Sequence, residues 1–197
     1  VISSDIFQKE RKIRVLIPER YFIDTLTTFA VTYVLDAQSD NFWNMAKSNI
    51  NYLVDQYAVI PMIIVGVVSE NRSAEFSPES TQLAQHLQQE VFPLIDQKYR
   101  TNQYHILIGH SWAGAFVGNT LFSKYKDLFD AYIGISPSLG AIDGRIFAHA
   151  DSMLHSRPPM KKYFYCSSGD VGISEQESRE DILIMDTLIG FYPNSTM

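Results

Sequence analysis

One segment of the sequence combines a nucleophilic side chain with the local context that activates such a group. Ser111 lies in the stretch Gly109-His110-Ser111-Trp112-Ala113-Gly114, between an aliphatic run and a helical pattern. The stretch is close to Gly-x-Ser-x-Gly, with Ala113 at the second glycine position and Gly114 directly after it. A tight strand–turn–helix of this kind, a nucleophile elbow, holds a strained serine whose oxygen can attack a carbonyl carbon. We therefore predict that Ser111 cleaves ester or amide bonds through an acyl-enzyme. The alternative is an ordinary turn with a helix-capping serine.

Attack on a carbonyl also requires hydrogen-bond donors for the developing oxyanion. The backbone N–H of Trp112 is expected at the start of the helix, where the helix dipole favours negative charge. This predicts Trp112 as the first oxyanion donor. A second N–H is expected from a loop after an earlier strand, and the segment Asp36-Ala37-Gln38 follows such a strand.

Alternating strand and helix patterns are expected to position these groups. Strand patterns followed by helix patterns indicate a mostly parallel central sheet with helices on both faces. Pro93 predicts a kink or break in the helical stretch 82–99. The predicted strands are 11–18, 29–35, 62–68, 105–108, 131–135 and 162–166, and the predicted helices are 42–56, 82–99, 112–125, 143–155 and 176–189.

The composition is that of an ordinary globular protein and excludes several classes of function. The chain has 197 residues, of which 46% are hydrophobic and 19% charged, and one domain over 1–197 is expected. A formal net charge of -6 argues against a nucleic-acid partner. No apolar run is long enough to cross a bilayer. The single cysteine, Cys166, is expected to be a buried thiol, and no residue spacing indicates a metal or a cofactor.

Five sequence segments, in this order, resemble the bacterial putative-esterase family of α/β hydrolases, which includes enterochelin-esterase-like and esterase-D-like enzymes. The resemblance extends from about Arg11 to Met197 and implies the α/β-hydrolase fold. It also implies that Gln38 supplies the second oxyanion N–H, where the family often has glycine at the position of Ala37. The segments are Val34-Leu35-Asp36-Ala37, residues 60–67, residues 92–101, residues 109–114 and Ser136-Pro137-Ser138-Leu139.

The order of catalytic groups in this fold is serine, then acid, then histidine. The acid is expected after the strand that ends near Ser167, where Asp170 and Glu175 are both candidates and Glu177 follows. No histidine follows Cys166, and the five histidines lie at positions 86, 105, 110, 149 and 155. We expect the base beyond Met197, so that the C-terminal part of the domain is incomplete. The family's longer glycine-rich loop is also replaced by a short connection near Ser80.

The predicted function is a serine hydrolase that cleaves a small-molecule carboxylic ester or thioester. Two alternatives stay open: a non-catalytic binding module on the same fold, and an acyltransferase. The identity of the ester, the oligomeric state and the compartment, cytoplasmic or periplasmic, are not readable because pocket-lining loops and targeting signals decide them.

Overall fold

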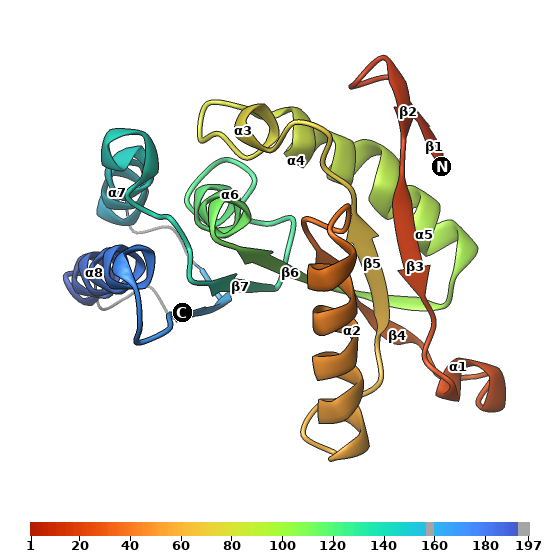
Figure 1. Ribbon diagram of the computed structural model, residues 1–197. Coiled ribbons are helices and arrows are strands. Elements are labelled where there is room, and N and C mark those ends of the chain that lie inside the picture. The colour runs from red at the N-terminus through yellow and green to blue at the C-terminus, as the bar shows by residue number, and fades with distance from the viewer. Residues whose placement is uncertain (157–159, 193–197) are drawn as a thin grey trace. The chain divides into compact units, whose positions relative to one another are not determined.

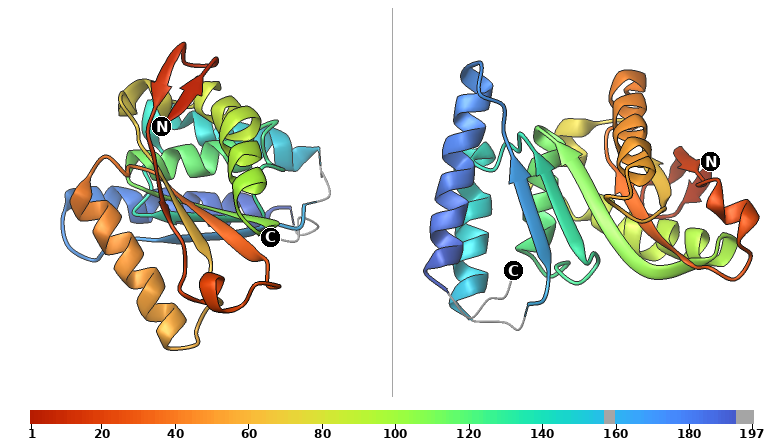
Figure 2. Two further views of the ribbon diagram at one scale, coloured as in Figure 1. Left: turned by 90° about the vertical axis from the view of Figure 1, so that its right-hand side faces the viewer. Right: turned by 90° about the horizontal axis from the view of Figure 1, so that it is seen from below.

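The computed structural model describes residues 1–156 and 160–192, which divide into two compact units (Figures 1 and 2). Unit 1 comprises residues 1–70 and 82–106, and unit 2 comprises residues 71–81 and 107–197. The strands form a mixed, mostly parallel sheet with helices around it, which confirms the predicted fold class. The expectation of a single domain over the whole chain stays a prediction.

Unit 1 contains the N-terminal strands and two helical layers. Its strands follow the order β3-β5-β4-β6, and β1 pairs separately with β2 as an antiparallel hairpin. The strands are β1 (Ile2–Ser4), β2 (Lys9–Arg11), β3 (Ile13–Leu16), β4 (Phe29–Val34), β5 (Ile63–Val67) and the first part of β6 (Thr101–His110). The helices are α1 (Arg20–Ile23), α2 (Asp40–Asp55), α4 (Gln82–His86), the π-helical turn η1 (Leu87–Val91) and α5 (Phe92–Lys98).

The sheet of unit 1 is covered on both faces, which explains the unbroken aliphatic runs of its strands. Every residue of β4 and β5 is buried, and the two strands are parallel. Adjacent side chains of a strand point to opposite faces. Val34 packs with Trp43 of α2, whereas the ring of Tyr33 lies 4.7 Å from that of Phe92 on α5. Helices α2 and α5 therefore cover opposite faces of β4 (Figure 1).

The helical stretch before β6 is interrupted earlier than the sequence predicts. A kink or break was expected at Pro93, but the regular helix gives way to η1 over Leu87–Val91. Pro93 itself lies in the first turn of α5. A proline fits the first helical turn because its missing N–H would have no intrahelical acceptor there. The departure from regular α-helix therefore lies in the wider π-helical turn before Pro93 and not at the proline itself.

Unit 2 contains the C-terminal half of the sheet, in the order β6-β7-β8. Strands β7 and β8 are parallel and pair Ala131 with Tyr163 through Ile135 with Ser167. Helix α6 packs on β7 and on α7, and α7 packs on α8 (Figure 2). The elements are α3 (Arg72–Glu75), the second part of β6, α6 (Trp112–Leu121), β7 (Ala131–Ile135), α7 (Ala141–His155), β8 (Tyr163–Ser167) and α8 (Ile173–Gly190).

Two elements of the second half differ from the sequence expectation. Strand β6 begins at Thr101 rather than at residue 105. The prediction missed this start because the first residues of the strand are mostly polar and exposed and give no hydrophobic signal. Helix α7 contains a kink at residues 142–144, all of which have positive φ. Asp143 lies in this kink, so the regular helix begins just after it.

Candidate active site

The backbone at Ser111 has the geometry of a nucleophile elbow. Ser111 connects β6 to α6 with φ 56° and ψ -118°, a region that non-glycine residues rarely occupy. Three backbone hydrogen bonds hold it there: its N–H donates to Ile135 O at 3.0 Å, and its carbonyl accepts from Ser138 at 3.1 Å and from Ala115 at 3.1 Å. Strained backbone persists only where surrounding contacts over-determine it, and these bonds do so.

The two glycines of the stretch allow the strand and helix to approach closely. A Cβ atom on Gly109 would lie 2.3 Å from the carbonyl oxygen of Ala113. A Cβ atom on Gly114 would lie 2.7 Å from the Cβ of Pro137, which follows β7. Both distances are shorter than real Cβ atoms show, so a larger residue at either position would displace the turn.

We expect Gly109→Ala to lower the free energy of unfolding by about 3 kcal/mol and to abolish activity. The added methyl would clash with backbone atoms of Ala113, which no rotamer change can relieve. Chemical denaturation checks the stability. Gly190→Ala is the matched control, because nothing lies within 4 Å of its Cβ position, and it should change stability by less than about 1 kcal/mol. Equal stability of the two variants would contradict a sterically required elbow.

A cavity of about 450 Å³ opens beside Ser111 within unit 2. Its lining comes from segments that follow the C-terminal ends of β6, β7 and β8, the edge at which ligands bind in open α/β sheets. The lining residues are His110, Ser111, Trp112, Ser136, Ser138, Gly140, Ala141, Ser174, Glu175, Glu177, Ser178 and Asp181. The structure therefore places Ser111, Trp112 and Glu175 of the predicted site on one cavity.

Glu175 is the more firmly oriented of the two predicted acids. Its Oε2 accepts from the hydroxyl of Ser136 at 2.7 Å and from the N–H of Gly169 at 2.6 Å. These two hydrogen bonds, with that from Ser136 the stronger cause, hold the pKa of the Glu175 carboxyl below its ordinary value of 4.5. Asp170 lies in an exposed bend and does not line the cavity.

Sequence reasoning did not assign a role to Ser136 or to Asp181. Ser136 has φ 43° and bonds its N–H to Ser167 O at 2.6 Å, so it connects the ends of β7 and β8. Asp181 accepts from the N–H of Gly140 at 2.6 Å. A signal for Ser136 existed, because it begins the segment Ser136-Pro137-Ser138-Leu139 that carries part of the family resemblance. Nothing in the helical pattern distinguished Asp181.

The side chain of Trp112 has a contact of its own, separate from its backbone N–H. Its Nε1 donates to the carbonyl of Arg72 at 3.1 Å, and Phe76 packs on Phe116 of α6 at 6.0 Å between ring centroids. Glu79 forms an ion pair with Arg145 of α7. The segment 71–81 is thus anchored on α6 and α7 within unit 2.

We expect Trp112→Phe to lower kcat/KM by no more than about tenfold. Phenylalanine keeps the backbone N–H and loses one indole hydrogen bond, which is worth about 1 kcal/mol. Hydrolysis of an activated aryl ester measures the effect, with Phe76→Leu as a control that loosens the same segment without touching position 112. A loss of a thousandfold in Trp112→Phe alone would assign the chemistry to the indole rather than to the main chain.

Gln38, the predicted second oxyanion residue, lies in a hydrogen-bonded turn of unit 1. Its neighbours use their N–H groups locally: Ala37 donates to Val67 O and Ser39 donates to Asp36 O, both at 3.0 Å. The Gln38 side chain donates to Asp36 Oδ1 at 2.7 Å and accepts from the N–H of Ser69 at 2.9 Å. Asp36, with φ 60°, makes the tight turn after β4. The turn is therefore fixed by side-chain as well as backbone bonds.

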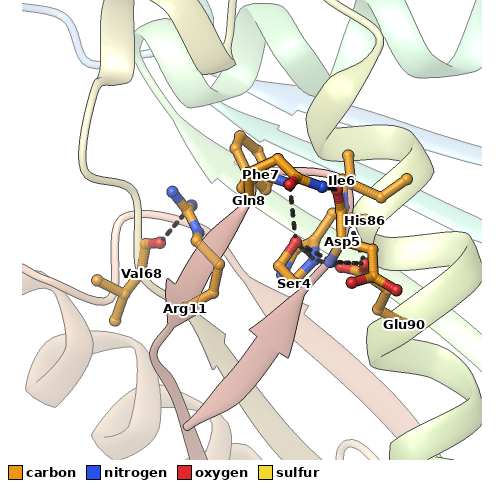
Figure 3. Close-up of polar contacts among 9 residues, drawn as sticks. All are labelled: Ser4, Asp5, Ile6, Phe7, Gln8, Arg11, Val68, His86 and Glu90. Carbon is orange, nitrogen blue, oxygen red and sulfur yellow. Dashed lines mark hydrogen bonds and ion pairs between the residues drawn. The ribbon is translucent and has the colours of Figure 1, made fainter.

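His86 belongs to a polar cluster in unit 1 that holds the N-terminal hairpin (Figure 3). Glu90 accepts from Ser4 Oγ at 2.6 Å and from the N–H groups of Asp5 at 2.7 Å and Ile6 at 3.1 Å, and it also contacts His86. The set contains a serine, a histidine and a carboxylate. Ser4 and His86 are only 3% and 1% exposed, however, so the cluster is closed to a substrate.

Three of the other histidines have structural surroundings, and His110 lines the cavity beside Ser111. The ring of His105 packs on two aromatic rings of unit 1. The polar or aromatic partners are Asp96 for His105, Asn119 for His149 and the ring of Tyr192 for His155. None of these three histidines lines the cavity beside Ser111.

A larger cavity, of about 780 Å³, lies in unit 1 at the opposite end of the strands from the Asp36 turn. It is lined by the segment after Leu16, which pairs with Ile64 at the start of β5, and by α2. None of its described lining residues is a serine, cysteine or histidine, so the smaller cavity is the candidate active site.

Cys166 does not contribute a second nucleophile. It is half-buried on β8, and burial raises the pKa of its thiol to about 12. Among residues 1–156 and 160–192, no group of three or more histidine, cysteine or carboxylate side chains is arranged to hold a metal ion. No helix in that part of the chain is both long and apolar enough to span a membrane.

The mixed, mostly parallel sheet with helices around it is that of an α/β hydrolase. The family model for Esterase, described as "Putative esterase", matches residues 4–173. The chain therefore belongs to this esterase family and is an ester-hydrolysing enzyme, as the resemblance predicted. No curated protein matches the chain.

Solved structures with the same fold confirm the architecture. The chain is similar to an IroE-like serine hydrolase from Shewanella oneidensis, with 19% identity, TM-score 0.72, and coverage of 98% of this chain and 78% of that chain. The BES protein from Bacillus cereus has 17% identity, TM-score 0.78, and coverage of 95% and 80%. The enterobactin esterase FES from Shigella flexneri has 14% identity, TM-score 0.76, and coverage of 99% and 51%, so the chain spans about half of its length.

Proposed function

We propose that Ser111 is the nucleophile of an esterase that works through an acyl-enzyme. The observation that carries this proposal is the positive φ of Ser111 at the start of α6, at the mouth of a cavity. Its hydroxyl oxygen attacks the ester carbonyl carbon while a general base takes its proton. The C–O bond to the alcohol breaks, and the alcohol leaves with that proton. Water then attacks the acyl-serine, releasing the acid and regenerating the hydroxyl.

The oxyanion of each tetrahedral intermediate accepts from the backbone N–H of Trp112, and the family resemblance implies the N–H of Gln38 as its second donor. Trp112 is the first residue of α6, where N–H groups have no acceptor within the helix. The support for Gln38 is that the N–H groups on both sides of it already donate to carbonyls, while its own follows the tight Asp36 turn. Donors fixed before the reaction stabilise the charge without reorganisation.

Glu175, rather than Asp170, is the acid that orients the base. It shares the cavity with Ser111, and bonds from Ser136 and Gly169 fix one carboxylate oxygen. The other oxygen remains to accept from a protonated base. A carboxylate fixed in this way stabilises the cation that forms when the base takes the Ser111 proton. The substrate is a small-molecule carboxylic ester or thioester.

Covalent labelling tests the proposal directly. A fluorophosphonate probe should add its phosphonyl group to Ser111, with loss of fluoride, and tryptic mass spectrometry should find the added mass on the peptide that contains residue 111. Labelling should cease in Ser111→Ala and persist in Ser174→Ala, which removes another hydroxyl from the same cavity. A protein that binds a fluorescent ester but is never labelled would be a binding module on this fold. Labelling at another residue would refute the assignment.

A further inference from the structure

The lining of the cavity beside Ser111 is rich in negatively charged side chains. Three carboxylates line it, those of Glu175, Glu177 and Asp181, all from α8. His110 is the titratable group of opposite sign in the described lining, and Arg179 on the same helix acts on Glu175 from outside the cavity. At neutral pH the described lining therefore carries an excess of negative charge.

The three carboxylates differ in how far the protein already uses them. Glu175 accepts from Ser136 and Gly169, and Asp181 accepts from Gly140. Glu177 is exposed on the rim of the cavity. The negative charge that meets an entering substrate therefore includes one carboxylate without a role in holding the backbone.

The electrostatic effect of the neighbouring carboxylates on Asp181 also indicates an accumulation of negative charge. Burial raises the pKa of the Asp181 carboxyl, and the charges of Glu177 and Glu180 raise it further. A carboxylate that its neighbours destabilise in this way is stabilised by an incoming cation. An incoming anion would add to the repulsion instead.

We propose that this cavity selects esters that carry a positive charge and disfavours esters that carry a carboxylate or phosphate. This inference rests on the proposed function of Ser111 and specifies the substrate class for that site. The charged group of the substrate lies towards α8, with its ester carbonyl at Ser111. The hydroxyls of Ser136, Ser138 and Ser178 make the remaining wall polar, so that a neutral hydroxylated ester ranks between the two charged classes.

Three para-nitrophenyl esters of matched size test the preference. Their acyl groups are gamma-trimethylammoniobutyrate, its uncharged tert-butyl isostere, and adipate with a free carboxylate, whose chain does not readily close to a cyclic anhydride. Each kcat/KM is divided by the rate of alkaline hydrolysis of the same ester, which removes differences in intrinsic reactivity. At pH 7.5 and low ionic strength we expect the cationic ester to exceed the anionic one by about tenfold, with the neutral ester between them. High salt should narrow the ratio, because exposed charges are screened.

A pair of charge-neutralising variants locates the cause. Glu177→Gln should reduce the ratio of cationic to anionic ester by about threefold, since it removes one exposed carboxylate from the rim. Asp186→Asn removes the same charge from the same helix but outside this cavity, and it should leave the ratio unchanged. The two variants have equal net charge, so any difference between them is local.

The outcomes separate this inference from the proposed function. If all three esters are hydrolysed at equal normalised rates, or the anionic one fastest, the charge preference is wrong while Ser111 can still be the nucleophile. A ratio that Glu177→Gln and Asp186→Asn change equally also overturns it. If Ser111→Ala hydrolyses the three esters as fast as the original protein, the proposed function fails instead.

Discussion

Replacement of Ser111 by alanine should lower kcat for para-nitrophenyl acetate by several orders of magnitude, on the order of 10³–10⁶. In the proposed mechanism the hydroxyl oxygen bonds to the acyl carbon, and without it only the oxyanion donors and substrate binding remain. The hydrogen bonds that hold position 111 in its positive-φ conformation all use backbone atoms. Alanine keeps them, so the melting temperature should change little. Stopped assays with pure enzyme measure kcat, and thermal unfolding measures the melting temperature.

Ser174→Ala is the matched control for this experiment. Ser174 lines the same cavity at the start of α8, and its replacement removes a hydroxyl of the same kind. It should keep activity within about tenfold. Equal activity in the Ser111 and Ser174 variants would remove the basis for a serine hydrolase, because the elbow would then have no chemical role.

Replacement of Glu175 by glutamine should lower kcat by about 10²–10⁴, the range for loss of a triad carboxylate. Glutamine is nearly the same size, and its carbonyl oxygen can still accept from Ser136 and Gly169. The variant therefore removes the charge and keeps the geometry. Asp170→Asn removes a charge from the alternative acid in the exposed bend and should change kcat by less than about threefold.

The pH dependence distinguishes an acid that acts on the base from one that only holds the backbone. A neighbouring carboxylate raises the pKa of a base that becomes cationic. In Glu175→Gln the acid limb of the kcat/KM profile should therefore move to lower pH, whereas it should stay in place in Asp170→Asn. An unmoved limb together with a small loss of rate would leave Glu175 a purely structural residue.

The lowered pKa of Glu175 also predicts that the stability of the protein depends on pH. Its folded-state pKa is lowered by the Ser136 and Gly169 hydrogen bonds, so its contribution is fully present well above its ordinary value of 4.5. That contribution is lost as the pH falls through the lowered folded-state pKa. The difference in melting temperature between the original protein and Glu175→Gln should accordingly be largest near pH 7 and shrink on acidification. A difference that grows towards acidic pH would contradict the sign of this shift.

The sequence by itself determined the parts of the fold that local patterns encode. The aliphatic runs predict β4 and β5 because strands buried on both faces must be apolar throughout. The elbow at Ser111 is equally local, since the glycines and the serine that form it lie within six residues. The strand 131–135 was predicted with the bounds that β7 has in the structure. The family resemblance, confirmed by the match over residues 4–173, rests on the order of such local segments.

The tertiary structure decided what depends on residues distant in the sequence. Asp170 and Glu175 were equal candidates by spacing, and the proposal of Glu175 rests on its place in the cavity lining and on the hydrogen bonds from Ser136 and Gly169. Strand β6 has 10 residues and begins at Thr101, four residues before the predicted strand 105–108, because backbone pairing rather than side-chain burial extends its polar start. The carboxylate of Asp181 reaches the cavity through the packing of α8, and no periodicity records where a helix docks. Local sequence encodes the turn that presents Ser111, whereas the partners and charges around it come from elements that folding brings together.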